Sequence, residues 1–206
     1  MSAIDIVFYI AILVMSIVVH EVSHGFMAEY FGDKTARYAG RLTLNPIKHL
    51  DPFGSIFLPV ILALSGANFL FGWAKPVPYN PDNLSNKKWG TVAVAAAGVL
   101  SNLLIAVLFG LLFRLSPFLN PPSGFYTIVP SIILINLALA IFNLVPIPPL
   151  DGSKILFSFL PQSLFKLVLF IEQYSLILLI IFIVFFSDYL YPILAYAFKL
   201  IAGLSL

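Results

Sequence analysis

The residues best suited to chemistry in this sequence are His20, Glu21 and His24, which lie inside its first long apolar segment. On a helix, His20 and His24 are one turn apart on the same face, so both imidazoles can reach a single metal ion. Glu21 stands beside the pair, where its carboxylate can take a proton from a metal-bound water. This pattern is typical of zinc-dependent hydrolysis of peptide bonds.

The composition predicts that this motif lies in a membrane. Of 206 residues, 61% are hydrophobic and 10% are charged, and the mean hydropathy is +1.03. A soluble domain of this size needs more charge on its surface, so we expect an integral membrane protein in contact with the lipid bilayer. The chain has no cysteine, so a metal must take nitrogen and oxygen ligands. A net charge of +2 does not favour a nucleic-acid partner.

Five to six apolar stretches are long enough, or nearly so, to cross the hydrocarbon core, which takes roughly 20 helical residues. We therefore predict an all-α polytopic membrane protein of one domain, residues 1–206. Its three-helix catalytic core comprises residues 4–31 and 90–152, with an insertion over 33–89 and C-terminal helices over 164–206. The stretches are 4–30, 53–73, 91–113, 125–149, 164–186 and a short sixth, 189–206.

Stretch 53–73 decides the predicted topology. If it crosses the membrane, the basic residues divide almost evenly between the two sides. If it is re-entrant, ten of the eleven basic residues lie on the cytoplasmic side and only Arg114 lies outside. The second arrangement follows the positive-inside rule. It also brings Asp151, at the end of the fourth stretch, to the same side as the histidines. We therefore predict a re-entrant segment and an active site towards the cytoplasmic side of the cell membrane.

Asp151 is the strongest candidate for a third metal ligand, because two histidines do not complete a catalytic zinc site. It follows Pro146, Pro148 and Pro149, which cannot sustain a helix. Irregular backbone at membrane depth is tolerated only where it is buried in protein or lines a wet cavity. An aspartate there is costly unless it binds a metal or another charge. The alternative is that Asp151 only caps the next helix.

The two motifs His20-Glu21-Val22-Ser23-His24-Gly25 and Asn143 to Gly152 (NLVPIPPLDG) together resemble the site-2 protease family of intramembrane zinc metalloproteases. The stretches Leu44 to Gly54 and Gly72 to Pro78 are similar to its small members, which lack PDZ and CBS domains. The resemblance covers residues 19–152.

The resemblance implies one zinc ion per chain, with His20, His24 and Asp151 as ligands and Glu21 as general base. It also implies that Asn143 helps to hold an extended substrate. Asn102 corresponds to a polar residue of a small-residue motif, here Ala97 to Asn102, and would stabilise an oxyanion or bind substrate. Val99 stands where proline is usual in that motif. A simpler role for Asn102 is an interhelical hydrogen bond.

Residues Thr35 to Thr43 are strand-like around Gly40, so we predict a short β-hairpin after the first helix. Its edge, with Tyr38 and Leu42, would pair with an unwound substrate by strand addition. His49, in a proline-flanked loop, is expected to be structural or interfacial, although it is also the next candidate for a metal ligand.

The sequence therefore predicts an intramembrane zinc metalloprotease whose partners are transmembrane segments of substrate membrane proteins. Two alternatives remain open. A membrane metal-binding or transport protein would use the same ligands without hydrolysis, but would have no need of Glu21 beside the first histidine, and the chain lacks the inverted repeat common in transporters. An inactive scaffold that binds transmembrane helices is the third possibility.

Overall fold

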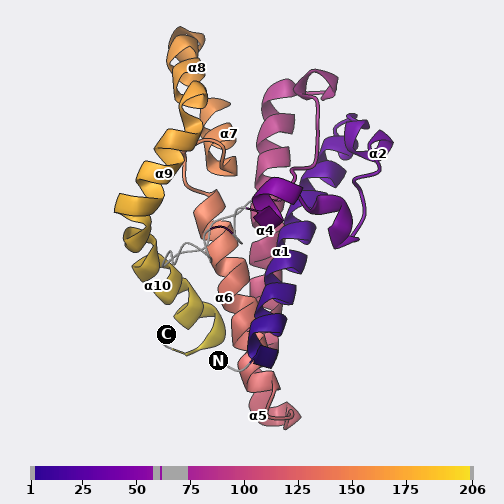
Figure 1. The fold of residues 1–206 in the computed structure, drawn as a ribbon, viewed down its shortest axis with the longest axis vertical. Coiled ribbons are helices and arrows are strands. Elements are labelled where there is room, and N and C mark those ends of the chain that lie inside the picture. Colours follow the sequence, from indigo (N-terminus) through magenta and orange to yellow (C-terminus); the bar gives the residue numbers. More distant parts are fainter. Residues whose placement is uncertain (1–2, 58–60, 62–73, 205–206) are drawn as a thin grey trace.

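The structure is a computed structural model that describes residues 3–57, 61 and 74–204, and every regular element in those ranges is helical (Figure 1). The longer helices are α1 (Ala3–Tyr30), α4 (Lys87–Arg114), α6 (Phe125–Asn143), α7 (Asp151–Phe157), α8 (Phe165–Gln173), α9 (Ser175–Phe186) and α10 (Leu190–Ala202). The shorter helical turns are α2 (Thr35–Tyr38), η1 (Pro46–His49), η2 (Pro52–Phe57), η3 (Pro81–Asn83), α5 (Ser116–Leu119), η4 (Gln162–Leu164) and η5 (Ser187–Tyr189).

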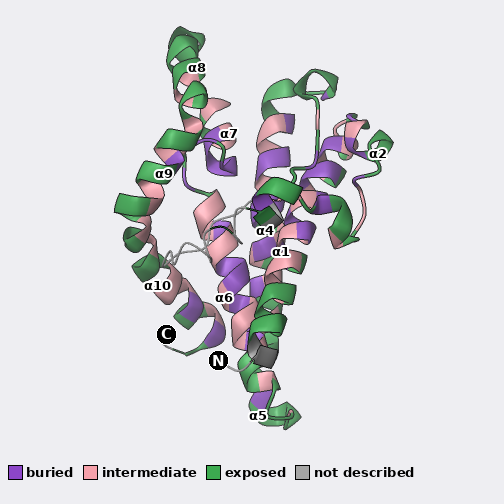
Figure 2. Ribbon diagram, in the orientation of Figure 1, coloured by how far each residue is buried: buried purple, intermediate pink, exposed green. Residues whose placement is uncertain are grey.

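Helices α1, α4 and α6 form the central bundle, with α4 packed against both of the others. Helix α10 closes the bundle at the end where both termini lie, by packing on α6 and α4. Buried residues lie mainly where these helices face one another (Figure 2). Many of the exposed residues are large and hydrophobic, as expected of a protein surrounded by lipid. The buried core at the α10 end consists of Ala106, Phe113, Val129, Ile133, Leu137, Phe198 and Ala202.

The described residues contain four helical spans long and apolar enough to cross a membrane: Ile6–Tyr30, Lys87–Arg114, Phe125–Asn143 and Ser175–Ala202. The prediction of five to six segments is therefore not confirmed. Most of the second stretch lies outside the described residues, and the last two predicted stretches share one span. Ser187–Tyr189 continues the helical path from α9 into α10 instead of ending it, and the Ser187 hydroxyl donates to the Ile183 carbonyl one turn earlier.

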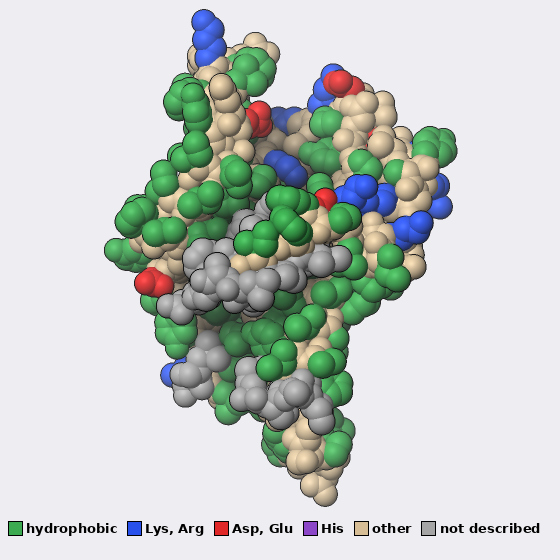
Figure 3. All heavy atoms as spheres, viewed as in Figure 1, with side chains coloured by type: hydrophobic (Ala, Val, Ile, Leu, Met, Phe, Trp, Pro, Cys, Tyr) green, Lys and Arg blue, Asp and Glu red, His purple; other side chains and the backbone are tan. Residues whose placement is uncertain are grey.

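The continuous last span corrects the expected charge distribution. Arg114, at the end of α4, donates from Nε to the Ile201 carbonyl (2.9 Å) and from Nη2 to the Leu200 carbonyl (2.6 Å). Lys199 therefore lies at the Arg114 end of the bundle, because α10 runs to that end. At most nine of the eleven basic residues can therefore lie at the opposite end. On the face in Figure 3, most Lys and Arg side chains gather in the upper half, near α2, α7 and α8.

The predicted β-hairpin over residues 35–43 is wrong. Thr35–Tyr38 forms the helical turn α2, and no strand occurs in the described part of the chain. The turn is anchored by Asp33, whose carboxylate accepts from the backbone N–H (3.2 Å) and the hydroxyl of Thr35. Gly40, at φ +64°, ends the turn in the left-handed region, where glycine has no steric penalty. The glycine around which the hairpin was expected thus ends a helical turn.

The described flanks of the predicted re-entrant segment meet. The Lys75 backbone N–H donates to the His49 carbonyl (2.9 Å), so the chain leaves and returns at one level of the molecule. Residues 58–60 and 62–73, which carry most of that predicted segment, lie outside the described residues. The re-entrant topology remains a prediction.

Candidate metal centre

Three side-chain atoms from two distant parts of the chain converge between α1 and the start of α7. His20 Nε2 lies 3.0 Å from His24 Nε2 and 3.1 Å from Asp151 Oδ2, and His24 Nε2 lies 3.2 Å from that same carboxylate oxygen. All three residues are buried. A tetrahedral zinc ion with bonds of about 2.0–2.1 Å separates its ligand atoms by roughly 3.3 Å. The observed triangle is therefore close to the size that such an ion requires.

Hydrogen bonds at the other imidazole nitrogens favour tautomers that direct both Nε2 lone pairs into this triangle, as a metal site needs. His24 Nδ1 lies 2.7 Å from the Val94 carbonyl, which can only accept, so Nδ1 carries the proton. His20 Nδ1 lies 3.3 Å from Asn102 Oδ1 and donates to it in the same way. In the neutral imidazoles both Nε2 atoms are then bare, and they face each other and an Asp151 oxygen. Three buried lone pairs at this spacing repel one another unless a cation lies among them.

Gly98 of α4 provides the space for the two imidazoles. A Cβ atom built on Gly98 would lie 2.5 Å from His24 Cε1 and 2.6 Å from His20 Cε1. Contacts under 3.0 Å are essentially never made by real Cβ atoms. The backbone of α4 therefore forms one wall of the centre, and a side chain at this position would displace both rings.

Asp151 reaches the histidines because the chain leaves α6 in a non-helical stretch over residues 144–150. It occupies the first turn of α7, where the helix dipole favours a carboxylate. A Cβ on the neighbouring Gly152 would overlap the carbonyl groups of Leu144 and Val145, so this helix start fits against the loop only with glycine. Lys154, one turn on, places Nζ 3.5 Å from Asp151 Oδ1, the oxygen that faces away from the triangle.

Glu21 lies close to the triangle but is not one of its three corners. A ligand atom from each of His20, Glu21 and His24 lies within 4.8 Å of the other two, a looser group than the triangle with its edges of 3.0–3.2 Å. Its Oε2 accepts a hydrogen bond of 2.8 Å from the Val77 backbone N–H. That position suits a base for a water bound at the centre better than it suits a direct ligand.

The remaining predicted site residues lie at different distances from the centre. Asn102 is fully buried and contacts His20, whereas Asn143 donates to the Leu139 carbonyl of its own helix (2.9 Å). Tyr38 is 82% exposed on α2, and Leu42 packs over Gly25 of α1. His49 is buried outside the cluster, with Nε2 2.8 Å from the Thr43 carbonyl.

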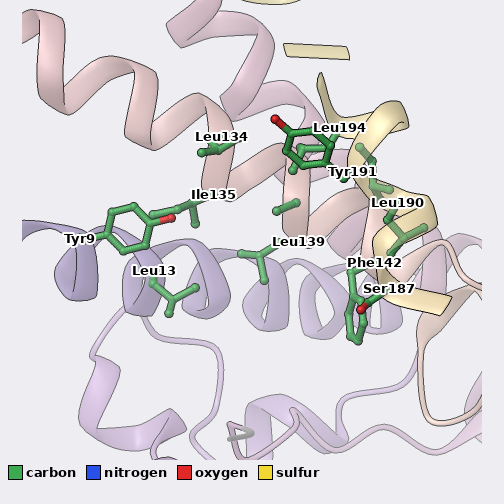
Figure 4. A pocket seen from close by; sticks show the side chains of 12 residues that line it. Tyr9, Leu13, Leu134, Ile135, Leu139, Phe142, Ser187, Leu190, Tyr191 and Leu194 are labelled. Carbon is green, nitrogen blue, oxygen red and sulfur yellow. The ribbon is translucent and has the colours of Figure 1, made fainter. Parts of the chain in front are cut away.

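An apolar groove of about 520 Å³ runs between α1, α6 and α10, away from the metal centre (Figure 4). Leu13, Leu139 and Leu194 project into it from the three helices, and Tyr9 and Tyr191 lie along its sides. The described residues that line it are almost all apolar and include no histidine or carboxylate. The groove is a hollow in the apolar surface of the helices.

Several groups around the centre are not visible in the sequence. The Val94 carbonyl and the Val77 amide are backbone atoms, so no residue type marks them. Lys154 and Arg41 carry charge, but only the fold shows their partners. Lys154 faces Asp151, and Arg41 contacts residues 75–76, next to the Val77 N–H that bonds to Glu21.

Comparisons with known proteins agree with this geometry. The family model described as "Peptidase family M50" matches residues 8–121 and 119–186. "Putative zinc metalloprotease YwhC" of Bacillus subtilis is 38% identical over 193 residues, which are 88% of this chain and 83% of that protein. "Putative zinc metalloprotease Rip2" of Mycolicibacterium smegmatis is 36% identical over 140 residues, 67% of this chain and 51% of that protein. No solved structure matches significantly.

Proposed function

The chain belongs to peptidase family M50, and on that premise we propose that it hydrolyses peptide bonds in or near transmembrane segments of other membrane proteins. Membership makes it a zinc metalloprotease, and its apolar helices make it a multi-pass membrane protein. The observation that carries the finer proposal is the position of the ligand triangle. His20 and His24 lie inside a 25-residue apolar helix, so the reaction would occur beside the hydrocarbon core.

His20, His24 and Asp151 are the residues that would hold the zinc ion. Their donor set of two imidazoles and one carboxylate is common in hydrolytic zinc sites, which keep a further position for water or substrate. When bound, zinc polarises the scissile carbonyl and makes water more acidic. The Val94 carbonyl and Asn102 fix the tautomers and orientations of the two imidazoles, so that both Nε2 atoms are available to the metal.

Glu21 would act as the general base. Its carboxylate takes a proton from the attacking water and gives that proton to the amine of the departing peptide, so that one group serves both halves of the reaction. The Val77 N–H donates a hydrogen bond to Glu21 Oε2, which leaves Oε1 for the proton transfer. A helical substrate hides its carbonyls in hydrogen bonds, so the segment must unwind locally before attack.

We assign the active site to the cytoplasmic side. Arg114 and Lys199 lie at one end of the bundle, whereas most Lys and Arg side chains on the face in Figure 3 gather towards the end that carries α2, α7 and α8. The triangle lies in the half of α1 nearer to that end, since His20 and His24 precede its last residue, Tyr30, by ten and six positions. An excess of Lys and Arg marks cytoplasmic loops.

Substrate contacts are proposed for Asn102, Asn143, Tyr38 and Leu42. Asn102 Nδ2 is buried and has no hydrogen-bond partner within the described ranges, so it offers a donor close to the metal. Tyr38 is exposed beside the end of α1 and is free to meet a substrate there. Tyr38→Ala and Asn143→Ala should raise KM while zinc content stays constant.

The test uses purified protein in lipid vesicles with quenched-fluorescent single-pass peptides, one set with glycine and proline at the centre and one fully helical. We expect about one zinc per chain and cleavage of the first set. Asp151→Ala should lose both zinc and cleavage, whereas Glu21→Gln should keep zinc and lose cleavage. A zinc-loaded protein that cleaves neither set, or a Glu21→Gln variant that still cleaves, would refute the proposal.

A further inference from the structure

Arg41 is a buried cation for which the described residues provide no counter-ion. Only 6% of its surface is exposed, and no carboxylate among the described residues lies within ion-pair distance of it. Its Nε has no hydrogen-bond partner in the described part of the chain. Burying an unpaired charge is costly, so such a group persists where it stabilises something specific.

The partners of Arg41 are two consecutive backbone carbonyls. Its Nη2 donates to the Lys75 carbonyl (2.6 Å) and to the Pro76 carbonyl (3.3 Å). The next backbone N–H along the chain, that of Val77, donates to Glu21 Oε2 (2.8 Å). The Pro76 carbonyl and the Val77 N–H belong to one peptide group. A single peptide plane thus has the guanidinium at its oxygen and the carboxylate at its hydrogen.

From this arrangement we propose that Arg41 is a positioning residue for Glu21, acting through the peptide group between Pro76 and Val77. The inference rests on the proposed function, in which Glu21 is the general base. Hydrogen bonds in a chain polarise one another, so a cation at the carbonyl strengthens the N–H as a donor. It also fixes the plane of the peptide, and with it the position of the Glu21 carboxylate.

Neighbouring contacts hold residues 75–77 from both sides. The side chain of Val77 is buried against Gly25, one residue after His24. The Lys75 N–H donates to the His49 carbonyl, and His49 itself bonds to the Thr43 carbonyl, so residues 41–49 and 74–77 form one unit. Arg41 supplies the only charge in that unit that reaches the peptide next to Glu21 among the described contacts.

Arg37 provides a matched control. It lies four residues earlier, pairs with Glu29 at the surface, and has no described contact with residues 75–77. Arg41→Met should lower kcat at least tenfold, with KM within twofold and zinc content unchanged. Arg41→Lys should recover part of kcat because an ammonium can still donate to one carbonyl. Arg37→Met should leave kcat, KM and zinc content unchanged.

A double-mutant cycle separates this role from general stabilisation. Val77→Pro removes the N–H that contacts Glu21, so Arg41→Met should cause little further loss of kcat in that background. Full and independent losses in the two variants would overturn the proposal, as would wild-type kcat in Arg41→Met or an equal loss in Arg37→Met.

Hydrogen–deuterium exchange gives a readout that needs no substrate. Residues 74–80 should exchange faster in Arg41→Met than in the wild type or in Arg37→Met. If the wild-type protein cleaves no test peptide, the proposed function fails, and the exchange result alone decides the link between Arg41 and the segment. Unchanged exchange in Arg41→Met would then refute the link.

Discussion

Gly98→Ala is the most direct test of the geometry around the metal centre. The added methyl would lie 2.5 Å from His24 Cε1, whereas ordinary van der Waals contact begins at 3.4 Å, so the ring would have to retreat by about 0.9 Å. Metal–ligand distances tolerate deviations of only about 0.2 Å. Neither ring is free to move, because His24 is bonded to the Val94 carbonyl and His20 to Asn102. We expect zinc affinity to fall at least about 100-fold, or roughly 2.8 kcal/mol.

The assay is zinc titration of metal-free protein in detergent, followed by the melting temperature with and without zinc. Zinc that binds only the folded state raises the melting temperature of the wild type, and this shift should be lost at equal zinc concentration in Gly98→Ala. Gly124→Ala is the matched control, because a Cβ at Gly124 meets nothing within 4 Å. If Gly98→Ala binds zinc as tightly as Gly124→Ala, the two imidazoles do not occupy the positions described here.

Three further predictions concern elements around the centre. The pKa of Asp33 is held below its ordinary value of 3.8, because hydrogen bonds from Thr35, Asn83 and Asn80 outweigh the opposing effect of burial. The stability that these hydrogen bonds provide is present above pH 3.8 and is lost as the pH falls below it. Metal-free Asp33→Asn should therefore be less stable than the wild type by about 2 kcal/mol at pH 7, and the difference in melting temperature should shrink towards pH 3. Gly40→Ala should cost about 1 kcal/mol in thermal melts, since φ is +64° and no neighbour lies within 4 Å; an unchanged melt would show that α2 does not end in the left-handed region. Arg114→Met should destabilise the protein by about 1 kcal/mol by freeing the α10 carbonyls, with no change in zinc content, and altered zinc binding would contradict the separation of that end from the centre.

The sequence could predict those parts of the site that depend on residue types and on short spacings along the chain. His20 and His24 are one helical turn apart, so any helix through them brings their imidazoles to one face. The prolines before Asp151 required irregular backbone, and the structure ends α6 at Asn143 before them. The apolar composition required membrane helices. Each inference depends on local geometry or on bulk solvation, which the sequence carries directly.

Sequence patterns failed where a capping contact or a continuing helix decided the conformation. Residues 35–43 have strand-like side chains, but the Asp33 carboxylate and the left-handed Gly40 close a helical turn instead. Residues 187–189 suggested a break, yet the chain continues from α9 into α10 and carries Lys199 to the Arg114 end. Strand and turn propensities are worth little free energy, so capping contacts and the packing of whole helices override them.

The sequence by itself determined that a metal-binding, water-activating helix lies in a membrane protein, because ligand chemistry and hydropathy are properties of residue types. Only the tertiary structure decided that Asp151 meets both histidines within 3.2 Å, that Gly98 makes room for the imidazoles, and that Arg41 reaches the peptide beside Glu21. These relations join residues 20 to 131 positions apart, and several of them pass through backbone atoms that no residue type reveals.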